Sequence, residues 1–324
     1  MSDERSIFGD VVAKARARVQ KNAETAAARG WVKAEPKAID RNCPRCTGTG
    51  TLMGREGEWA KARLCACREP CALCNDARYV MREVDGYDVA VPCECSALVS
   101  RIAVFNDAQI PAGYADKRLS ALGPNDPDGY SDRRLESLKR AKAEVIRYSV
   151  SMLSDNEQGL LLIGGLGLGK THLVCALLSY LTLERGIACR FIDYADLMAR
   201  LRASFEDGAE EKGSAIIEAL VQAPVLAIDD LGKGQGTNWE LSILDQIVTR
   251  RYNARRIILA TTNYLPEMWL ARRPGGRDDR KRRDLGETLE ERIGERLVSR
   301  LKQACSFQLL EGGDYRVEGP RGPH

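Results

Sequence analysis

Two copies of one cysteine pattern lie between residues 43 and 95 of the 324-residue chain. Each copy reads C-x2-C-x18-C-x-C, and the second copy repeats the first 28 residues further along. The first copy contains Cys43, Cys46, Cys65 and Cys67, and the second contains Cys71, Cys74, Cys93 and Cys95. Two close pairs of cysteines, brought together by a hairpin, supply the four thiolates that tetrahedral zinc prefers. The sequence therefore predicts two structural Zn²⁺ ions per chain.

Two alternatives remain open for these cysteines. Four thiolates can also hold an iron–sulfur cluster, although paired knuckles separated by a loop favour zinc. The two copies could form separate, sequential sites, which is the arrangement we expect, or a cross-braced arrangement that mixes them. Glycines in the first knuckle, CPRCTGTG, are expected to leave backbone N–H groups free to point at the sulfurs. Modules this small have too little core to fold without metal.

A second constellation has the pattern G-x-x-x-x-G-K-[ST], which is typical of a phosphate-binding loop. The expected nucleotide-binding residues are Gly164, Gly165, Leu166, Gly167, Leu168, Gly169, Lys170, Thr171 and His172. Glycines let the loop turn its N–H groups toward phosphate oxygens, and the following helix adds its dipole. Lys170 is expected to neutralise the β- and γ-phosphates, and the Thr171 hydroxyl is expected to bind Mg²⁺.

Acidic and polar residues follow two further apolar runs. Asp229 and Asp230 come directly after residues 225–228, at the kind of strand end where α/β sheets bind ligands. Asp229 is expected to hold Mg²⁺ through water, and Asp230 to polarise the attacking water. Asn263 follows the run at 257–260 and could orient that water or sense the γ-phosphate. The sequence thus predicts a site for hydrolysis of a nucleoside triphosphate.

The elements that must position these residues are short apolar runs separated by helical patterns. Runs at 159–163, 188–192, 225–228 and 257–260 read as buried strands, and a helical pattern begins at Leu135. This alternation predicts an α/β domain in which helices cover both faces of a parallel sheet. We expect a mobile basic arm at 1–42, a duplicated zinc-binding domain at 43–105 and the ATPase domain at 106–324, which opens with a polar joint at 106–132.

Composition excludes other classes of site. With only two histidines, His172 and the last residue His324, a Ser-His-Asp hydrolase or a histidine-rich metal centre is not expected. The chain has 49 basic and 46 acidic residues, which gives a net charge of +3. This small net charge does not by itself predict a polyanion partner. No signal-peptide pattern or membrane-length apolar run is present, so a cytoplasmic location with reduced thiols is expected. The cysteines outside the repeat, Cys175, Cys189 and Cys305, are expected in the core.

The order of the motifs resembles the AAA+ ATPases, and more narrowly the bacterial helicase loaders DnaC and DnaI with the related transposition ATPase IstB. The resemblance covers about residues 106–316. It rests on GLLLIGGLGLGKTHL, RFIDYADLMARLRASF, VLAIDDLG, TNWELSILDQIVTRRYNARRIILATTN and GERLVSRL. The lead-in QIPAGYADKRL is also similar to that of the group.

The resemblance implies an ATPase that assembles head to tail. Arg300 would then match the arginine finger that reaches the γ-phosphate of the neighbouring subunit, with Arg296 assisting, and Asn263 would match the sensor at the strand end. The usual Asp-Glu of AAA+ proteins is Asp-Asp here, a variant found in this group, and its shorter reach leaves the rate of hydrolysis open. No clear later sensor arginine is present; Arg316 is a weak candidate.

The resemblance also implies partners. DnaI-like loaders carry an N-terminal zinc module that contacts the replicative helicase, although duplication of the module departs from that pattern. Residues 194–212 lie where helicase loaders insert helices along a single-stranded DNA path, and candidate contacts there are Arg200, Arg202, Phe205 and Lys212. A basic stretch at 271–284 is a second candidate. For both stretches an ordinary solvated segment remains the alternative.

The motifs are compatible with three functions. The leading one is ATP-dependent loading of a replicative helicase onto single-stranded DNA. An IstB-type ATPase acting on duplex DNA with a transposase is the nearest alternative. A zinc-dependent binding scaffold with a nucleotide switch is the third.

Overall fold

The computed structural model describes residues 42–84, 87–119, 132–151, 158–206, 210–270 and 286–311. The arm predicted at 1–42, apart from Asn42, the basic stretch at 271–284 and Arg316 lie outside these residues. Among the described residues, no helix is long and apolar enough to span a bilayer.

The centre of the molecule is a five-stranded parallel sheet with the order β6-β7-β8-β5-β9. Its strands are β5 (Gly159–Gly164), β6 (Cys189–Asp193), β7 (Val225–Asp229), β8 (Ile257–Thr262) and β9 (Cys305–Leu310). The four strands predicted from apolar runs are confirmed within one or two residues. The fifth, β9, was not predicted, because Ser306 and Gln308 interrupt its apolar character on a half-buried edge.

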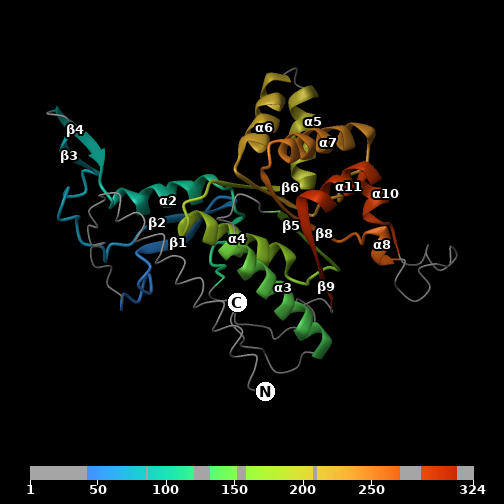
Figure 1. Ribbon diagram of the computed structural model, residues 1–324, viewed down its shortest axis with the longest axis horizontal. Coiled ribbons are helices and arrows are strands. Elements are labelled where there is room, and N and C mark those ends of the chain that lie inside the picture. Colours follow the sequence, from blue (N-terminus) through green and yellow to red (C-terminus); the bar gives the residue numbers. More distant parts are fainter. Residues whose placement is uncertain are drawn as a thin grey trace.

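Helices cover both faces of this sheet, as predicted (Figure 1). They are α3 (Asp132–Ser151), α4 (Lys170–Leu183), α5 (Tyr194–Glu206), α6 (Glu210–Gln222), α7 (Asn238–Asn253), α8 (Glu267–Leu270), α10 (Leu289–Ile293) and α11 (Glu295–Ala304). Alternate side chains of β5 enter opposite cores: Leu160 and Leu162 pack toward α3 and α4, and Leu161 and Ile163 pack toward α5, α7 and α11.

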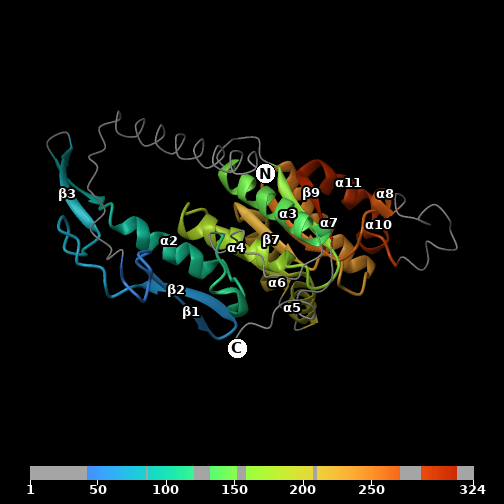
Figure 2. The same ribbon diagram turned by 90° about the horizontal axis from the view of Figure 1, so that it is seen from below.

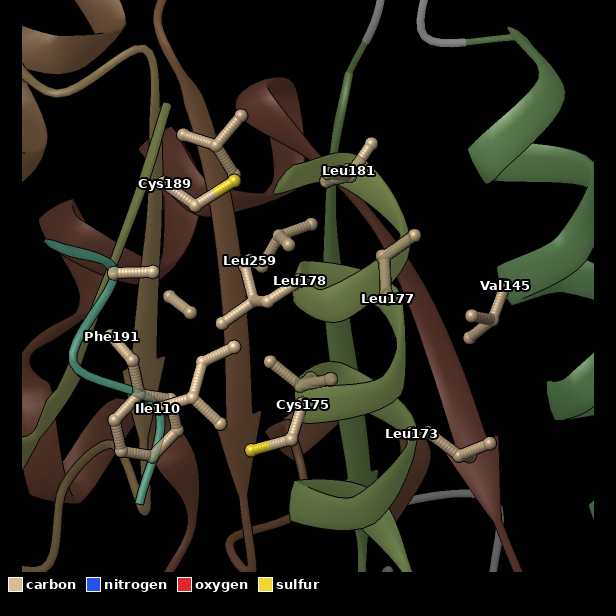
Figure 3. Packing of buried hydrophobic residues seen from close by; sticks show 14 of the residues in the cluster. Ile110, Val145, Leu173, Cys175, Leu177, Leu178, Leu181, Cys189, Phe191 and Leu259 are labelled. Atoms are coloured by element: carbon tan, nitrogen blue, oxygen red, sulfur yellow. The ribbon is translucent and has the colours of Figure 1, made fainter. Parts of the chain in front are cut away.

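Figure 3 shows the first of these cores at close range. Leu178 of α4 lies against Leu259 of β8, and Ile110 lies beside Phe191 of β6. The three cysteines outside the repeat are all buried, and Cys175 and Cys189 belong to this core. Burial raises the pKa of each of these thiols, so they remain protonated. They are core residues, as the sequence predicts.

Two antiparallel hairpins precede the central sheet. The first joins β1 (Thr51–Glu56) to β2 (Trp59–Leu64), and the second joins β3 (Tyr79–Val84) to β4 (Tyr87–Pro92). Helix α2 (Ser96–Asp107) and a short 3-10 turn, η1 (Ala112–Tyr114), lead from them into the ATPase domain. In both Figure 1 and Figure 2 the β3–β4 hairpin lies at the end of the molecule remote from α8.

The first hairpin shares a core with the central sheet and its helices. Ala60 and Ala62 of β2 are buried in the same cluster as Ile102 and Phe105 of α2 and the leucines of α4. The predicted boundary between residues 105 and 106 therefore falls inside α2, which continues to Asp107. Residues 108–115, expected to be part of a polar joint, are instead partly core: Ala108 and Ile110 are fully buried. The division into domains stays a prediction.

Candidate nucleotide site and metal centres

Lys170 is the first residue of α4 and lies against the loop that precedes it. Its ammonium group donates hydrogen bonds to the carbonyls of Gly164 (2.9 Å) and Gly165 (2.7 Å). A third bond, of 2.7 Å, goes to Oδ1 of Asn263, just after β8. Because the side chain is buried and held on three sides, its charge is fixed at the centre of the loop. The structure thus brings together two residues that the sequence predicts for the site, 93 positions apart.

Glycine conformation shapes the loop at its junction with the helix. Gly169 is the N-cap of α4 and has φ of 82°, a left-handed conformation that side-chain-bearing residues rarely adopt. Leu168 turns inward and is buried, whereas Leu166 at the tip is exposed. His172 is half-buried, and burial lowers the pKa of its imidazole, which keeps it neutral near pH 7. Nothing about His172 indicates a role in proton transfer.

Asp229, at the end of β7, faces the hydroxyl of Thr171. Both carboxylate oxygens lie 3.0 Å from Thr171 Oγ1, and Thr261 of β8 donates a third hydrogen bond of 2.6 Å. Burial raises the pKa of Asp229, while the two hydroxyl donors act to lower it. A hydroxyl and a carboxylate in contact are the hard oxygen ligands that suit Mg²⁺. Thr171 and Asp229 therefore fit the magnesium site predicted for them.

Asp230 lies just beyond the strand in a left-handed conformation, with φ of 52°. Its backbone N–H donates to Thr261 Oγ1 at 2.9 Å, and its carboxylate pairs with Lys233 at 2.8 Å. Thr261 therefore fixes both acidic residues. Sequence reasoning selected Asn263 but missed Thr261, because its role depends on the pairing of β7 with β8.

The two predicted arginines of α11 have different environments. Arg296 is exposed and Arg300, one turn later, pairs with Asp245 of α7. Arg292 of α10, which was not predicted, donates hydrogen bonds to the carbonyls of Gly232 and Gly234. The sequence motif in this region, GERLVSRL, begins at Gly294, two residues after Arg292, so it gave no signal for Arg292.

Each cysteine copy forms its own cluster, with all four sulfurs within 4.8 Å of one another. Sulfurs that approach across each hairpin lie 3.8 and 3.5 Å apart in the first cluster and 3.8 and 3.3 Å apart in the second. A tetrahedral ion with Zn–S bonds of ~2.3 Å separates its sulfurs by about 3.8 Å. The donor sets therefore fit one zinc each. The grouping is sequential, and the cross-braced alternative is wrong.

The backbone favours the thiolate form of one cysteine of the first cluster, Cys46, whereas burial and the neighbouring thiols raise the pKa of Cys67 to about 12. Burial acts to raise the pKa of Cys46, but hydrogen bonds from the backbone of Gly50 and Gly48 and from neighbouring thiols lower it to about 7. These are the glycines of CPRCTGTG that were expected to direct N–H groups at the sulfurs. A thiolate is the form that binds metal.

The candidate DNA contacts on α5 already have protein partners. Arg200 pairs with Asp196 and lies over the Trp59 ring of the first hairpin. Arg202 pairs with the buried Glu240 and lies over Trp239. Lys212 is exposed, and the side chain of Phe205 lies outside the described residues. These contacts favour the alternative of an ordinary helix pair.

Residues 136–272 match the family of IstB-like ATP-binding proteins. In the sheet, the strand that leads into the phosphate-binding loop, β5, lies between β8 and β9. Over 180 residues, 55% of its length, the chain is 28% identical to the replicative helicase loader DnaC of Buchnera aphidicola subsp. Schizaphis graminum and covers 63% of it.

Another relative matches a shorter part of the chain, and one solved structure matches a slightly longer part. It is 31% identical over 113 residues, 35% of the chain, to the putative ATP-binding protein of insertion sequence IS5376 from Geobacillus stearothermophilus, and covers 43% of that protein. A crystal structure of the DnaC helicase loader is similar at 26% identity and a TM-score of 0.47, covering 61% of this chain and 99% of that one. The chain spans between 34% and 63% of the length of the curated relatives that it matches. The family match begins at residue 136, so it does not include the zinc modules.

Proposed function

We propose that this protein is an ATPase that loads a replicative helicase onto single-stranded DNA. The proposal is supported mainly by one observation: the chain combines a nucleotide site similar to that of IstB-like and DnaC proteins with a duplicated four-cysteine module. ATP binding favours head-to-tail assembly and a grip on DNA, and hydrolysis releases the loader. The working location is the cytoplasm.

Each residue of the site has a role in this proposal. ATP lies in the loop from Gly164 to His172, with Lys170 on its β- and γ-phosphates. Thr171 and Asp229 hold Mg²⁺, which neutralises phosphate charge when bound. Asp230 polarises the attacking water, Asn263 senses the γ-phosphate, and Arg300 with Arg296 serves the neighbouring subunit. The supporting geometry is the chain of contacts from Thr171 through Asp229 to Thr261, and from Lys170 to Asn263.

The second hairpin is the part best suited to hold a partner protein. The hairpin and the cysteine knuckle before it expose large apolar side chains: Leu73 of the knuckle and Tyr79 and Met81 of β3 are 61%, 60% and 64% exposed. Soluble proteins that gather exposed apolar side chains on one small module commonly use them for binding. The cysteine repeat adds a comparison within the chain, because each position of the second hairpin has an equivalent 28 residues earlier.

The equivalent face of the first hairpin is covered by a helix. Met53 pairs across the strands with Ala62, and both pack in the core formed with α2. Their equivalents, Met81 and Ala90, pair in the same register but are exposed. Because the first hairpin binds the apolar side of α2, where Ile102 and Phe105 are buried, we infer that the second binds an apolar helix of the helicase.

Met81→Glu is expected to weaken capture of the helicase by roughly tenfold or more, because a buried interface methionine would be replaced by a charge. The measurement is binding of the purified helicase from the same genome to the full-length protein. Met268→Glu on α8 is the matched control, since Met268 is also exposed, at 45%, but lies on the ATPase domain. Equal capture by the Met81 variant and the wild type would contradict this docking face.

The proposed function itself is tested by loading. The protein, ATP and the helicase are mixed with circular single-stranded DNA, which has no end to thread onto, and DNA-bound helicase is measured. We expect ATP-dependent transfer of helicase to the circle. Absence of any helicase association, with or without nucleotide, would overturn the proposal.

The insertion-sequence relative and the IstB-like family match favour one second candidate, an ATPase that organises duplex DNA for a transposase. Preference for duplex over single-stranded DNA, with ATP-dependent bending of the duplex, would select it. ATP binding without detectable hydrolysis in any assembly would instead select a binding scaffold with a nucleotide switch.

A further inference from the structure

Arg292 contacts two parts of the nucleotide site that are distant in sequence: the loop after β7 and Tyr264 after β8. Its Nε donates to the carbonyl of Gly232 at 2.9 Å, and its Nη2 donates to the carbonyl of Gly234 at 2.5 Å. Its guanidinium carbon also lies 5.2 Å from the centre of the Tyr264 ring. The side chain is only 18% exposed, so these contacts are largely shielded from water. Two fork hydrogen bonds and a stacked ring require a planar guanidinium, which lysine cannot replace.

Arg292 pairs with Glu287 at 3.3 Å, and its other contacts adjoin residues assigned to hydrolysis in its own subunit. Gly232 and Gly234 follow the acidic pair at the end of β7. Tyr264 follows Asn263, which accepts the hydrogen bond from Lys170. Gly232 has φ of 91°, and an added Cβ would lie 3.2 Å from the Tyr264 ring and 3.4 Å from Arg292 Cβ. The loop is thus packed tightly against Arg292 and Tyr264, so that a shift of one displaces the others.

Arg292 lies just before α11, the helix that carries Arg296 and Arg300. We call α11 the finger helix, because Arg300 is the proposed arginine finger. Helix α10 ends at Ile293, Gly294 follows with φ of 86°, and α11 begins at Glu295. Arg296 and Arg300 lie in the first two turns of α11. The other end of α10 is fixed by a capping box between Thr288 and Glu291. The Arg292 side chain and a short, fixed helix therefore connect the loop carbonyls to the start of α11.

We propose that Arg292 is a positioning residue that sets the finger helix of its own subunit according to the state of that subunit's acidic loop. Its effect then falls on the ATP of the neighbouring subunit, because the finger acts there. This inference rests on the proposed head-to-tail ATPase. Arg292 would thus couple the nucleotide site of one subunit to that of the next subunit in the assembly.

The test separates effects within a subunit from effects on its neighbour. The carrier protein, Asp230→Asn, is deficient in hydrolysis, and because all three carriers share this substitution, its own effect on the acidic loop cancels in the comparison. Wild-type protein is assembled with a large excess of full-length carrier, and ATP hydrolysis per wild-type subunit is measured. Three carriers are compared: Asp230→Asn alone, with added Arg300→Ala, and with added Arg292→Lys. Binding of ATP by each carrier and its melting temperature establish that it is folded.

With Arg292→Lys in the carrier, hydrolysis by wild-type neighbours is expected to fall about tenfold, as with Arg300→Ala, because small misplacements of a reacting group have effects of this size. If the Arg292→Lys carrier matches the Asp230→Asn carrier while the Arg300→Ala carrier reduces hydrolysis, the coupling role is wrong. If neither added substitution reduces hydrolysis, the trans-acting finger of the proposed function fails as well. Should Arg292→Lys not fold, Tyr264→Leu in the carrier is substituted, and the same comparison decides.

Discussion

Lys170→Ala is expected to abolish ATP binding at micromolar concentrations while leaving both zinc ions in place. The ammonium group is buried and held by two loop carbonyls and Asn263, so its charge is already positioned for phosphate. Hydrogen bonds to charged groups contribute about 1.5–3 kcal/mol each, and loss of about 3 kcal/mol weakens binding roughly a hundredfold. The measurement is equilibrium binding of a fluorescent ATP analogue, with zinc content determined on the same sample.

Lys233→Ala is the matched control, because it removes a lysine from the same edge of the sheet. Lys233 is 58% exposed and pairs with Asp230, so its loss is expected to change ATP affinity by less than about threefold. Asn263→Ala is expected to leave binding largely intact and reduce hydrolysis, since the sensor role concerns the γ-phosphate. Simultaneous loss of zinc and ATP binding in Lys170→Ala would contradict the separation of the two kinds of site. Retained ATP binding would contradict the role assigned to the lysine.

The sequence predicted the fold wherever local pattern was sufficient. Four of the five strands are mostly apolar runs, and buried strands of a parallel sheet have this composition. The edge strand β9, with Ser306 and Gln308, has no such signal, because its polarity reflects its half-buried place in the finished sheet. The phosphate-binding loop and the cysteine clusters were predictable because their ligands are close in sequence.

The rest of the candidate site depends on residues far apart in the chain. Thr261 reaches Asp229 across 32 positions, and Arg292 reaches Gly232 across 60. No local period or spacing encodes these contacts, since they exist only after the strands pair and α10 packs. The cysteine repeat also did not predict where each copy lies in the fold. The two copies have the same spacing, yet the first hairpin packs in the core beside the central sheet and the second lies at the end of the molecule.

This asymmetry predicts different consequences for the loss of each zinc. Cys46→Ser and Cys74→Ser alter equivalent positions of the repeat, and each is expected to remove one of two zinc ions. Cys46→Ser is also expected to destabilise the ATPase domain and weaken ATP binding. Cys74→Ser is expected to leave both unchanged. The measurements are zinc content, the melting temperature and affinity for the ATP analogue.

The physical link from the first zinc site to the ATPase sheet runs through β2. Asn106 of α2 exchanges two hydrogen bonds with the backbone of Ala62, at 2.7 and 3.0 Å. The N–H of Ala60 donates to the carbonyl of Ile110 at 2.7 Å, and the N–H of Phe191 in β6 donates to that of Ala108 at 2.8 Å. Residues 108–110 therefore join the zinc hairpin to the edge of the central sheet. A zinc-dependent hairpin in this place supports the sheet directly.

Small four-cysteine modules depend on zinc for folding, so Cys46→Ser should release β1–β2 from this contact. Loss of about three buried backbone hydrogen bonds corresponds to roughly 3 kcal/mol, or a fall of about 10 °C in melting temperature for a domain of this size. The second hairpin has exposed equivalents of the packed residues, so Cys74→Ser removes its zinc without removing a contact of the ATPase core. A matching fall in both variants would show that the second module also supports the ATPase domain. No fall in either would show that the first hairpin holds its place without zinc.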